Sequence, residues 1–373
     1  MSRSIERLLA YQIEARHTPG AVVHVERGGK VLAHCVAGRL GPDSAEPMHD
    51  GALFRLASLS KAIVSFAALM QVDAGLLALD APASDYLPLL AGLRMKSGAR
   101  PQRALTVRDL LRHTAAVPYE WDIPDAEVRA AALQSELAAR LPLLGAETLL
   151  DTLARRPLAQ QPGTAFRYGY ATDLLGMIVA QLDGVPLGAA LARRIFDPLG
   201  MTETGFEVPP AAQSRLASAY PEDAAWHARV AAYGIRHGDR PWMESGGGGL
   251  VGTLGDYARF ARLLANRGVI GSERMLSPKL FAEMGRNQLA AGDDGPLAFT
   301  GPGFGFGLGL AVRLDRGPAA MPCVAGEQVW SGISGTALFV HPGEQWFALA
   351  FTSNMASRMM ARMEFRRAVA SLF

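Results

Sequence analysis

The sequence contains very little cysteine. Only Cys35 and Cys323 occur among its 373 residues, and they form no CxxC pair. No HExxH spacing is present either, so the sequence predicts neither a disulfide framework nor a zinc site. We therefore expect a protein that needs no metal ion and no other cofactor.

The sequence also lacks a strong charge imbalance and a long apolar run. Lysine and arginine together number 37 and aspartate and glutamate 35, so the net charge is +2, and the basic residues are scattered. This pattern excludes an extended basic surface for nucleic acid or for an anionic membrane. No stretch offers about 18 uninterrupted apolar residues, so no membrane span is predicted. The expected partner is a small molecule, and nothing indicates an oligomeric state.

The first 16 residues do not have the pattern of a signal peptide. Their apolar side chains, among them Ile5, Leu8 and Leu9, recur at helical spacing between charged residues and form no continuous apolar core. We therefore expect an amphipathic first helix and a cytoplasmic location.

The composition is that of a compact enzyme. Hydrophobic residues make up 49% and charged residues 19%, with 40 glycines and 23 prolines. These values exclude an extended disordered chain or a coiled coil. The length exceeds the roughly 150 residues at which one core usually stops growing, so two subdomains or one elaborated domain are both compatible with it.

Strand patterns occur at both ends of the chain. Residues 20–27 and 30–38 have the pattern of two strands, and Gly28 with Gly29 forms a turn between them, which predicts an antiparallel hairpin. Residues 336–354 predict a second hairpin, and residues 355–373 an amphipathic helix.

The middle of the chain is mostly helical in pattern and is interrupted by proline and glycine. We therefore predict an α/β (α+β) fold, with an antiparallel sheet built from both chain ends, flanking helices and an inserted, mostly helical domain. The predicted α/β domain comprises 1–75 and 246–373, the helical domain comprises 76–245, and the active site lies at their interface. Residues 205–245 and 285–325 are predicted to be long loops.

Ser58 and Lys61 form the first candidate for chemistry. A helical apolar pattern begins at Ala62, which places Ser58 at a helix start and Lys61 one turn later on the same face. A serine hydroxyl needs a neighbour that accepts its proton, and a desolvated lysine can serve as that neighbour. The helix N-terminus adds a positive dipole where an oxyanion would form. Alone, the spacing is weak support, because serine often caps helices.

Two further segments strengthen this candidate. Tyr168 lies in a turn directly before a helical pattern, and a phenolate beside an ammonium can act as a general base. Trp330, Gly332 and Ile333 lie at the predicted start of the penultimate strand, which we expect at a sheet edge. Gly332 would allow a substrate to approach closely, and the Ile333 N–H could complete an oxyanion hole with the Ser58 N–H.

The order of these motifs resembles that of a known family. S-x-x-K at Ser58 to Lys61, a tyrosine ahead of a helix at Tyr168 and a W-x-G strand at Trp330 resemble the serine beta-lactamase and penicillin-recognising superfamily. Within it, the chain is most similar to the class C-like branch and the family VIII carboxylesterases. The resemblance spans nearly the whole chain, with further similar segments at 105–114, 198–206 and 245–260.

The resemblance implies a beta-lactamase/transpeptidase-like fold and a role for each motif. Ser58 would be the acylated nucleophile, and Lys61 and Tyr168 its base pair. The N–H groups of Ser58 and Ile333 would bind the oxyanion.

Two departures from the lactamase pattern bear on the substrate. Tyr170 stands where those lactamases have the asparagine of Tyr-x-Asn, and Trp330 stands where they have the lysine of Lys-Thr-Gly. That lysine helps to hold a substrate carboxylate, whereas tryptophan offers an apolar face. We therefore expect a serine carboxylesterase for neutral esters. Trp330, Gly332, Tyr170, Tyr119 and Trp121 are the predicted substrate-binding residues.

Other motifs are given structural interpretations. Ser84 with Asp85 imitates the S-D-N element of class A enzymes but lies in a proline-rich turn. The glycines of 247–252 fit a dinucleotide fingerprint but follow no strand pattern. His113 is expected to be a buried structural histidine, and Asp173 a helix-start or supporting group rather than a proton carrier.

Several alternatives to the ester hydrolase remain open. The acyl group could pass to an alcohol or amine, as in an acyltransferase or amidase, or the substrate could be a beta-lactam or a D-amino-acid peptide. Outside enzymes, the chain could be a penicillin-binding-like sensor that is acylated once. The sequence leaves the natural acyl chain and alcohol undetermined.

Overall fold

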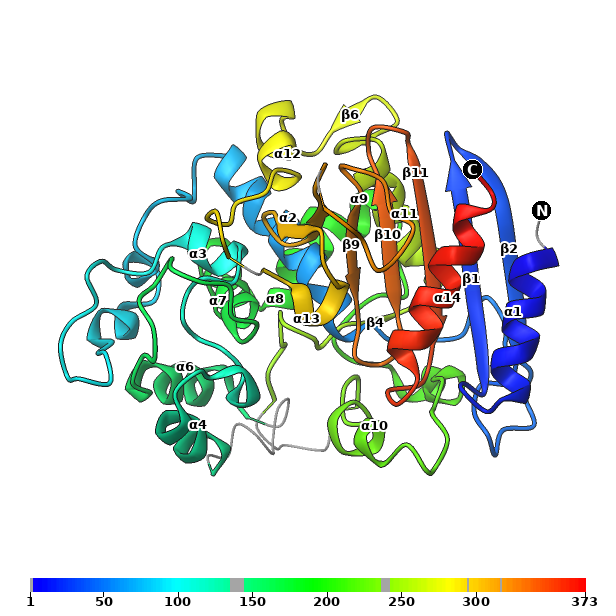
Figure 1. The fold of residues 1–373 in the computed structure, drawn as a ribbon, viewed down its shortest axis with the longest axis horizontal. Helices are drawn as coiled ribbons and strands as arrows, with labels where there is room; N and C mark the ends of the chain where they lie inside the picture. The colour runs from blue at the N-terminus through cyan, green and yellow to red at the C-terminus, as the bar shows by residue number, and fades with distance from the viewer. Residues whose placement is uncertain (1–2, 135–143, 236–241, 294, 316) are drawn as a thin grey trace.

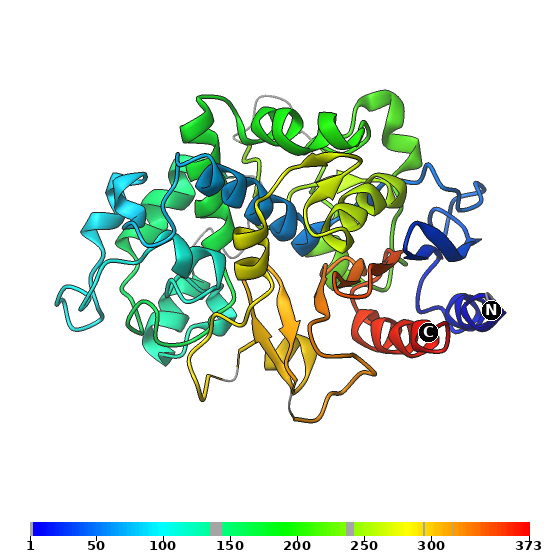
Figure 2. The same ribbon diagram turned by 90° about the horizontal axis from the view of Figure 1, so that it is seen from above.

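A computed structural model describes the chain except for residues 1–2, 135–143, 236–241, 294 and 316. A large sheet forms the body of the molecule, with helices on both of its faces and a helical region beside it (Figure 1). The two chain ends lie close together at one side of the molecule (Figures 1 and 2).

The large sheet has seven strands in the order β2-β1-β11-β10-β9-β8-β7, and all neighbours are antiparallel. The sequence therefore correctly predicted a sheet assembled from both chain ends. The strand bounds are β1 Gly20–Arg27, β2 Lys30–Gly38, β7 Phe304–Phe306, β8 Ala311–Arg313, β9 Gln328–Ser331, β10 Ala337–His341 and β11 Trp346–Thr352. Two pairs of two-residue strands complete the described strands: β3 Phe54–Arg55 with β4 Val251–Gly252, and β5 Val269–Ile270 with β6 Glu273–Arg274.

The strand that carries Trp330 was placed wrongly from the sequence. Trp330 lies in β9, which is the third strand from the end of the chain and is flanked by β10 and β8. It is therefore an interior strand and not a sheet edge. The predicted loop 285–325 contributes β7 and β8, because three-residue strands rich in glycine leave too few residues for a readable alternation.

Helices cover both faces of the sheet. On one face α1 Arg3–Glu14 and α14 Arg358–Ala370 pack against each other and against β2 and β11. On the other face α11 Leu254–Ala265 packs on β1, β10 and β11 (Figure 2). Each helix turns an apolar side toward the sheet, which explains the amphipathic spacing seen at both chain ends.

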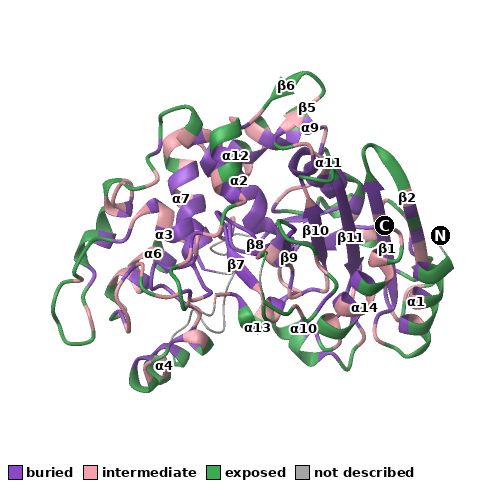
Figure 3. Cartoon of the chain, turned by 45° about the horizontal axis from the view of Figure 1, so that its top comes forward, coloured by how far each residue is buried: buried purple, intermediate pink, exposed green. Residues whose placement is uncertain are grey.

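The central helix α2 Ser60–Asp73 is buried on almost every side (Figure 3). Its residues from Ser60 to Leu69 are all buried, and it packs against α7 Ala171–Asp183. A helix that is apolar all round must lie inside a protein. Because α2 lies between the sheet and the helical region, it holds the residues at its start in a fixed position between both parts.

The remaining helices belong mostly to the helical region. Their bounds are α3 Val107–Leu111, α4 Ala126–Leu133, α6 Ala146–Arg155, α8 Leu187–Leu191, α9 Asp197–Leu199, α10 Ala224–Arg229, α12 Pro278–Met284 and α13 Leu297–Thr300. In the described part of the chain, no single helix has the length and apolar character needed to cross a membrane; α7 with Leu187–Leu199, a pair bent by 75°, does so only by length and composition.

Asp109 anchors the start of the helical region. Its carboxylate accepts hydrogen bonds from the Thr106 N–H and the Thr114 hydroxyl, both at 2.9 Å, and completes the capping box of α3. Arg103 and Arg112 bind the same carboxylate at 2.6 and 2.9 Å. Burial alone would raise the pKa of Asp109, but these partners outweigh it and hold the pKa at about 2, below the usual 3.8.

We expect Asp109 to contribute to stability above about pH 4 and to lose that contribution as the pH falls toward 2, because only the unfolded chain binds a proton in that window. Asp109→Asn should lower the free energy of unfolding by about 2–4 kcal/mol at neutral pH. Urea unfolding at about pH 7 and about pH 3 measures both effects. Glu26, whose pKa is also about 2, titrates in the same window, so only the difference between wild type and variant belongs to Asp109. Parallel pH profiles for the two proteins would contradict the lowered pKa.

Candidate active site

Ser58 lies in a tight turn immediately before α2. Residues Ala57–Leu59 form one turn of 3-10 helix, and the α-helix begins at Ser60. Ala57 adopts a left-handed backbone with φ of 47°, a conformation that is costly for a residue with a side chain. The turn leaves Ser58 half-buried, while its neighbours Ala57 and Leu59 are buried. The predicted place at a helix start is therefore correct to within one turn.

Lys61 is buried, with 1% of its surface exposed. Its Nζ donates to the Gly247 carbonyl oxygen at 2.5 Å and to the Tyr119 hydroxyl at 3.2 Å. The ammonium also lies 4.6 Å from the centre of the Tyr168 ring. A buried ammonium needs such partners, because its desolvation is otherwise very costly. Among the described residues, the hydrogen bonds of Lys61 Nζ go to Gly247 and Tyr119 and none goes to Ser58, so the predicted proton transfer stays a prediction.

Tyr168 is buried and fixed from two sides. Its backbone N–H donates to the Asp122 carboxylate at 2.8 Å, and its hydroxyl accepts a hydrogen bond from Trp330 Nε1 at 3.3 Å. The rings of Tyr168 and Trp330 lie 5.3 Å apart. The structure thus brings together three residues from distant parts of the chain. Lys61 follows Ser58 by three positions, Tyr168 comes from the helical region, and Trp330 comes from β9.

The two oxyanion candidates come from different segments: Ser58 lies in the 3-10 turn before α2, and Ile333 lies in the turn after β9. The Ile333 N–H has no hydrogen-bond partner among the described residues, so it remains a free donor. It follows Gly332, whose own N–H donates to the Thr336 carbonyl at 2.7 Å. The Thr336 hydroxyl in turn donates to the Leu56 carbonyl at 3.0 Å, two residues before Ser58.

Gly332 is required for a reason other than the predicted one. A side chain at this position would meet the Thr336 hydroxyl at 2.3 Å and the Leu56 carbonyl at 2.5 Å. The close approach is therefore between two segments of the protein, the turn after β9 and the segment before Ser58. A close approach of a substrate to Gly332 stays a prediction.

The structure gives Tyr119 a more direct role than the pocket wall predicted for it. Its hydroxyl binds the Lys61 ammonium, and its ring lies 5.5 Å from that of Tyr168. Burial and the nearby Asp173 charge raise the pKa of Tyr119 well above its usual value, so it stays a neutral phenol. The sequence gives no signal for this contact, because 58 residues separate Tyr119 from Lys61.

Tyr170 is buried against Glu120 and Tyr119. It is 1% exposed, and its hydroxyl donates to the Glu120 carboxylate at 2.9 Å. Burial and the Glu120 charge raise the pKa of Tyr170 far above its usual value. Glu120 also pairs with Arg156 at 2.7 Å, and the Tyr170 ring packs 4.6 Å from that of Tyr119. These contacts give Tyr170 a supporting place next to Tyr119, and its predicted contact with a substrate stays a prediction.

Trp121 lies at the outer end of the aromatic group. It is 48% exposed, and its ring contacts Tyr119 at 6.2 Å and Phe299 at 6.1 Å. Phe299 also reaches the Tyr168 ring at 4.7 Å. Trp121 thus remains a predicted substrate contact, and Phe299, which lies in the predicted loop 285–325, is an additional aromatic residue that the sequence did not indicate.

Asp173 supports the loop that binds Lys61. Its carboxylate accepts hydrogen bonds from the Ser245 hydroxyl at 2.5 Å and the Gly247 N–H at 3.0 Å, and the Gly247 carbonyl receives Lys61 Nζ. Burial raises the pKa of Asp173, although Lys61 and Ser245 oppose the shift. The glycines of 247–252 therefore belong to this loop and to β4, in agreement with the structural interpretation from the sequence.

His113 is a buried neutral histidine. Burial lowers its pKa well below the usual value, and the Lys61 charge adds to this effect. Its ring packs 4.9 Å from Tyr168 and 5.5 Å from Phe306. Ser84 and Asp85 lie in a separate 3-10 turn, as expected for a structural S-D element.

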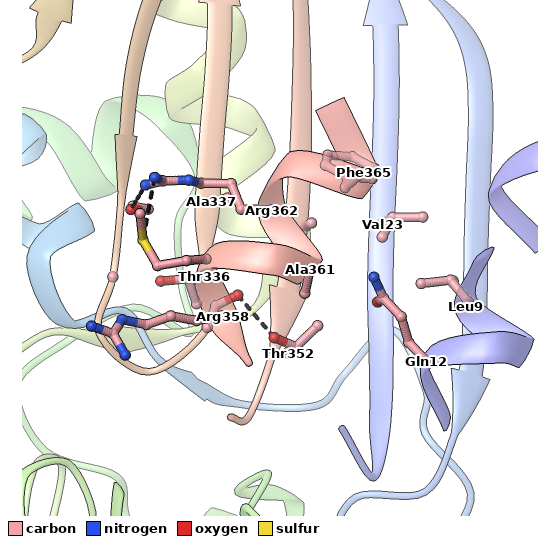
Figure 4. Close-up of a pocket in the computed structure, with 15 residues that line it drawn as sticks. Leu9, Gln12, Val23, Thr336, Ala337, Thr352, Arg358, Ala361, Arg362 and Phe365 are labelled. Carbon is pink, nitrogen blue, oxygen red and sulfur yellow. Dashed lines mark hydrogen bonds between the residues drawn. The ribbon is translucent and has the colours of Figure 1, made fainter. Parts of the chain in front are cut away.

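A small cavity lies between the sheet and the helices α1 and α14 (Figure 4). Its volume is about 20 Å³, room for about one water molecule, and it is lined by residues such as Leu9, Val23 and Phe365. It is therefore a packing gap and not a place for an ester. On its lining, Arg362 donates to the Ser331 hydroxyl and the Phe299 carbonyl, which ties α14 to β9 and α13.

The sequence matches a family model described as Beta-lactamase over residues 5–372. The chain belongs to this beta-lactamase family. It is 32% identical over 358 residues to Esterase EstB of Burkholderia gladioli, an alignment that covers 91% of this chain and 87% of that protein. It is 34% identical over 333 residues to Protein Rv1367c of Mycobacterium tuberculosis, covering 85% and 81% respectively.

Solved structures agree with this assignment. EstCE1, a hydrolase with promiscuous acyltransferase activity, superposes with a TM-score of 0.83 at 28% identity and covers 98% of this chain and 97% of that one. The unliganded simvastatin synthase LovD from Aspergillus terreus has a TM-score of 0.80 at 20% identity, covering 99% and 98%, and shows the shared fold. The chain is therefore a serine hydrolase with the beta-lactamase/transpeptidase fold, near the family VIII esterases in its superfamily.

The indole N–H of Trp330 gives a testable contribution to the site. Trp330→Phe keeps an apolar ring but removes the hydrogen bond to the Tyr168 hydroxyl, so kcat for a p-nitrophenyl ester should fall about tenfold with KM nearly unchanged. Trp346→Phe, in β11, is the matched control, because its ring packs 4.7 Å from that of Phe373 at the end of the chain, and it should change kcat less than about twofold. Initial rates over a range of substrate concentrations separate the two constants. Equal kcat values for Trp330→Phe and wild type would show that the hydrogen bond does not act in turnover.

Proposed function

We propose that this protein is a serine carboxylesterase, related to family VIII, which cleaves neutral carboxylic esters through an acyl-enzyme on Ser58. The observation that carries the proposal is the shared environment of Lys61, Tyr168 and Trp330 directly beside the turn that holds Ser58. A general base pair, a nucleophile at a helix start and a free backbone donor are the parts that acyl transfer requires.

The proposed reaction has two halves. Lys61 and Tyr168 accept the Ser58 proton while Oγ attacks the ester carbonyl, and the oxyanion binds the N–H groups of Ser58 and Ile333. Tyr168 then protonates the leaving alcohol as the carbon–oxygen bond breaks. Water then attacks the acyl-enzyme carbonyl and gives a proton to the base pair. The base pair returns this proton to Ser58 Oγ as the acyl carbon–Oγ bond breaks, which releases the carboxylic acid and restores the free serine.

Trp330 supports a preference for uncharged substrates. It is 4% exposed and turns its N–H toward Tyr168, so the position supplies an apolar ring and one neutral donor. The rings of Tyr119, Tyr168, Trp121 and Phe299 contact one another in series beside it. Such a surface favours apolar acyl or alcohol groups over carboxylates. A small-molecule ester as partner and a cytoplasmic location remain predictions.

Acyl transfer to an alcohol is the second candidate function. The supporting observation is the similarity to EstCE1, whose description names promiscuous acyltransferase activity. The same acyl-enzyme serves both reactions, and the acceptor decides between them, because an alcohol in place of water yields a new ester. Beta-lactam hydrolysis, peptidase or amidase activity and a sensor role have weaker support, since Trp330 stands where the lactamases have a lysine.

Ser58→Ala should abolish ester hydrolysis and leave the fold intact, because it removes only the hydroxyl group of a half-buried residue in the 57–59 turn. We expect at least a 10⁴-fold loss of kcat/KM, roughly the scale for loss of a nucleophile. Ser84→Ala, in the rejected S-D turn, is the matched control and should retain wild-type rates. Hydrolysis of p-nitrophenyl butyrate and circular dichroism measure activity and fold, and wild-type turnover by Ser58→Ala would refute the proposed nucleophile.

A substrate panel tests the preference for neutral esters. Wild type should hydrolyse a short p-nitrophenyl ester at least about 10²-fold faster in kcat/KM than the matched p-nitroanilide or a chromogenic cephalosporin. Adding a primary alcohol should divert part of the acyl group to a new ester, which mass spectrometry detects. Faster turnover of the cephalosporin would favour a lactamase, and a long-lived adduct without turnover would favour a sensor.

A further inference from the structure

One segment contacts Ile333 and also Arg55, which lies three residues before Ser58. We call residues 217–234 the bridging segment; it contains α10 and lies beyond one end of the sheet, near the start of α14 (Figure 1). Its sequence has weak periodicity and was predicted to be part of a long loop. Its contacts join β3, the short strand that precedes Ser58, to the turn that carries Ile333.

Arg55 connects the bridging segment to the nucleophile. Arg55 lies in β3, three residues before Ser58, and is 7% exposed. Its guanidinium donates to the carbonyl oxygens of Ala231 at 2.7 Å and Tyr233 at 2.9 Å. The guanidinium also lies 5.1 Å from the centre of the Trp226 ring. Burial lowers the pKa of Arg55 to about 10, so the side chain stays charged at neutral pH and keeps these hydrogen bonds.

Asp223 connects the same segment to the oxyanion turn. It is 8% exposed, and one carboxylate oxygen caps α10 by accepting from the Trp226 N–H at 3.1 Å. The other oxygen accepts from the N–H groups of Met355 at 2.5 Å and Ala356 at 3.1 Å. A carboxylate that accepts several backbone hydrogen bonds holds them more tightly than a neutral acceptor would.

The Met355 turn reaches Ile333 by two routes. Asn354, the residue before Met355, donates its N–H to the Ser334 carbonyl at 2.8 Å. Trp226 and Met355 also form an apolar cluster into which Ile333 packs. A displacement of the Met355 turn would therefore act on Ser334 through its carbonyl group and on Ile333 through its side chain.

We propose that Asp223 and Arg55 are positioning residues that set the spacing between the two oxyanion donors, the N–H groups of Ser58 and Ile333. The inference rests on the proposed function. An oxyanion hole works only when both donors lie about 2.7–3.1 Å from the developing charge, and a displacement of about 1 Å costs on the order of 10²-fold in rate. The direct hydrogen bond from Thr336 to the Leu56 carbonyl also joins the two sides, so removing one link loosens the spacing without separating them.

Asp223→Asn is the principal test. The amide keeps the size of the side chain but removes the charge and places an NH₂ group against backbone N–H donors. We expect kcat for a p-nitrophenyl ester to fall about 10- to 100-fold with KM within about threefold of wild type. Affinity for a trifluoromethyl ketone, whose carbonyl becomes an anionic adduct when Ser58 adds to it, should fall by the same factor.

Ser277→Ala is the matched control, because Ser277 caps α12 through the Leu280 N–H and α12 lies away from α10 (Figure 1). It should reduce the melting temperature to a similar degree without changing kcat or ketone affinity. Arg55→Lys keeps the charge but cannot reach both carbonyls in the same way, and it should show the same selective loss. It also serves as the second variant if Asp223→Asn does not fold.

The outcomes separate this proposal from the proposed function. If wild type hydrolyses esters and binds the ketone but Asp223→Asn and Arg55→Lys match Ser277→Ala in both readouts, the positioning role is overturned and the esterase stands. If the ketone does not bind wild type, or if Ser58→Ala retains turnover, the proposed function itself is overturned. A selective, parallel loss of kcat and ketone affinity supports both.

Discussion

The candidate site depends on the burial of one ammonium group. Lys61 lies 1% exposed on a helix that is apolar on nearly every side, where an unpartnered charge would be very costly. The Gly247 carbonyl, the Tyr119 hydroxyl and the face of the Tyr168 ring together replace its hydration. Each partner comes from a different part of the chain. The burial of α2 therefore depends on tertiary contacts that bring these three segments to the Lys61 ammonium.

This requirement explains the supporting residues around the site. Asp173 fixes the Gly247 loop through the Ser245 hydroxyl and the Gly247 N–H. Glu120 and Tyr170 hold Tyr119 from beneath. Asp173, Glu120 and Tyr170 need not touch a substrate. They fix the positions of the groups that bind the Lys61 ammonium, and this charge sets the electrostatic field near Ser58 and Tyr168. The buried charge therefore links the stability of the interior to the chemistry at the start of α2.

Part of this arrangement could be predicted from the sequence. The apolar runs of the terminal hairpins are separated by glycine turns, and the amphipathic terminal helices follow from their spacing, so the assembly of the sheet from both chain ends could be predicted. Ser58 and Lys61 share one helix turn, and Tyr168 stands at a helix start, so their local positions follow from local pattern. The resemblance to a known family supplied their roles, which local pattern alone left weak.

The rest is set by contacts between distant segments. Tyr119 approaches Lys61, and Asp223 approaches Met355, through tertiary packing that leaves no period in the sequence. The strands β7 and β8 are too short to alternate, and the interior place of β9 depends on them. The hydrogen bond from Tyr170 to Glu120 is another such contact, because 50 residues separate the two side chains.

Trp330 shows how one residue can affect both selectivity and the base. Trp330 stands where the lactamases have a lysine, so the position carries no cation to hold a substrate carboxylate. Its indole N–H donates to the Tyr168 hydroxyl. A hydrogen bond to a phenol oxygen favours the ionised form, which a general base needs. A lysine at this position would favour the same ionisation through its charge but would also attract anionic substrates. Tryptophan therefore keeps part of the electrostatic support for Tyr168 while making the surface beside Ser58 apolar, and this combination suits a hydrolase of uncharged esters.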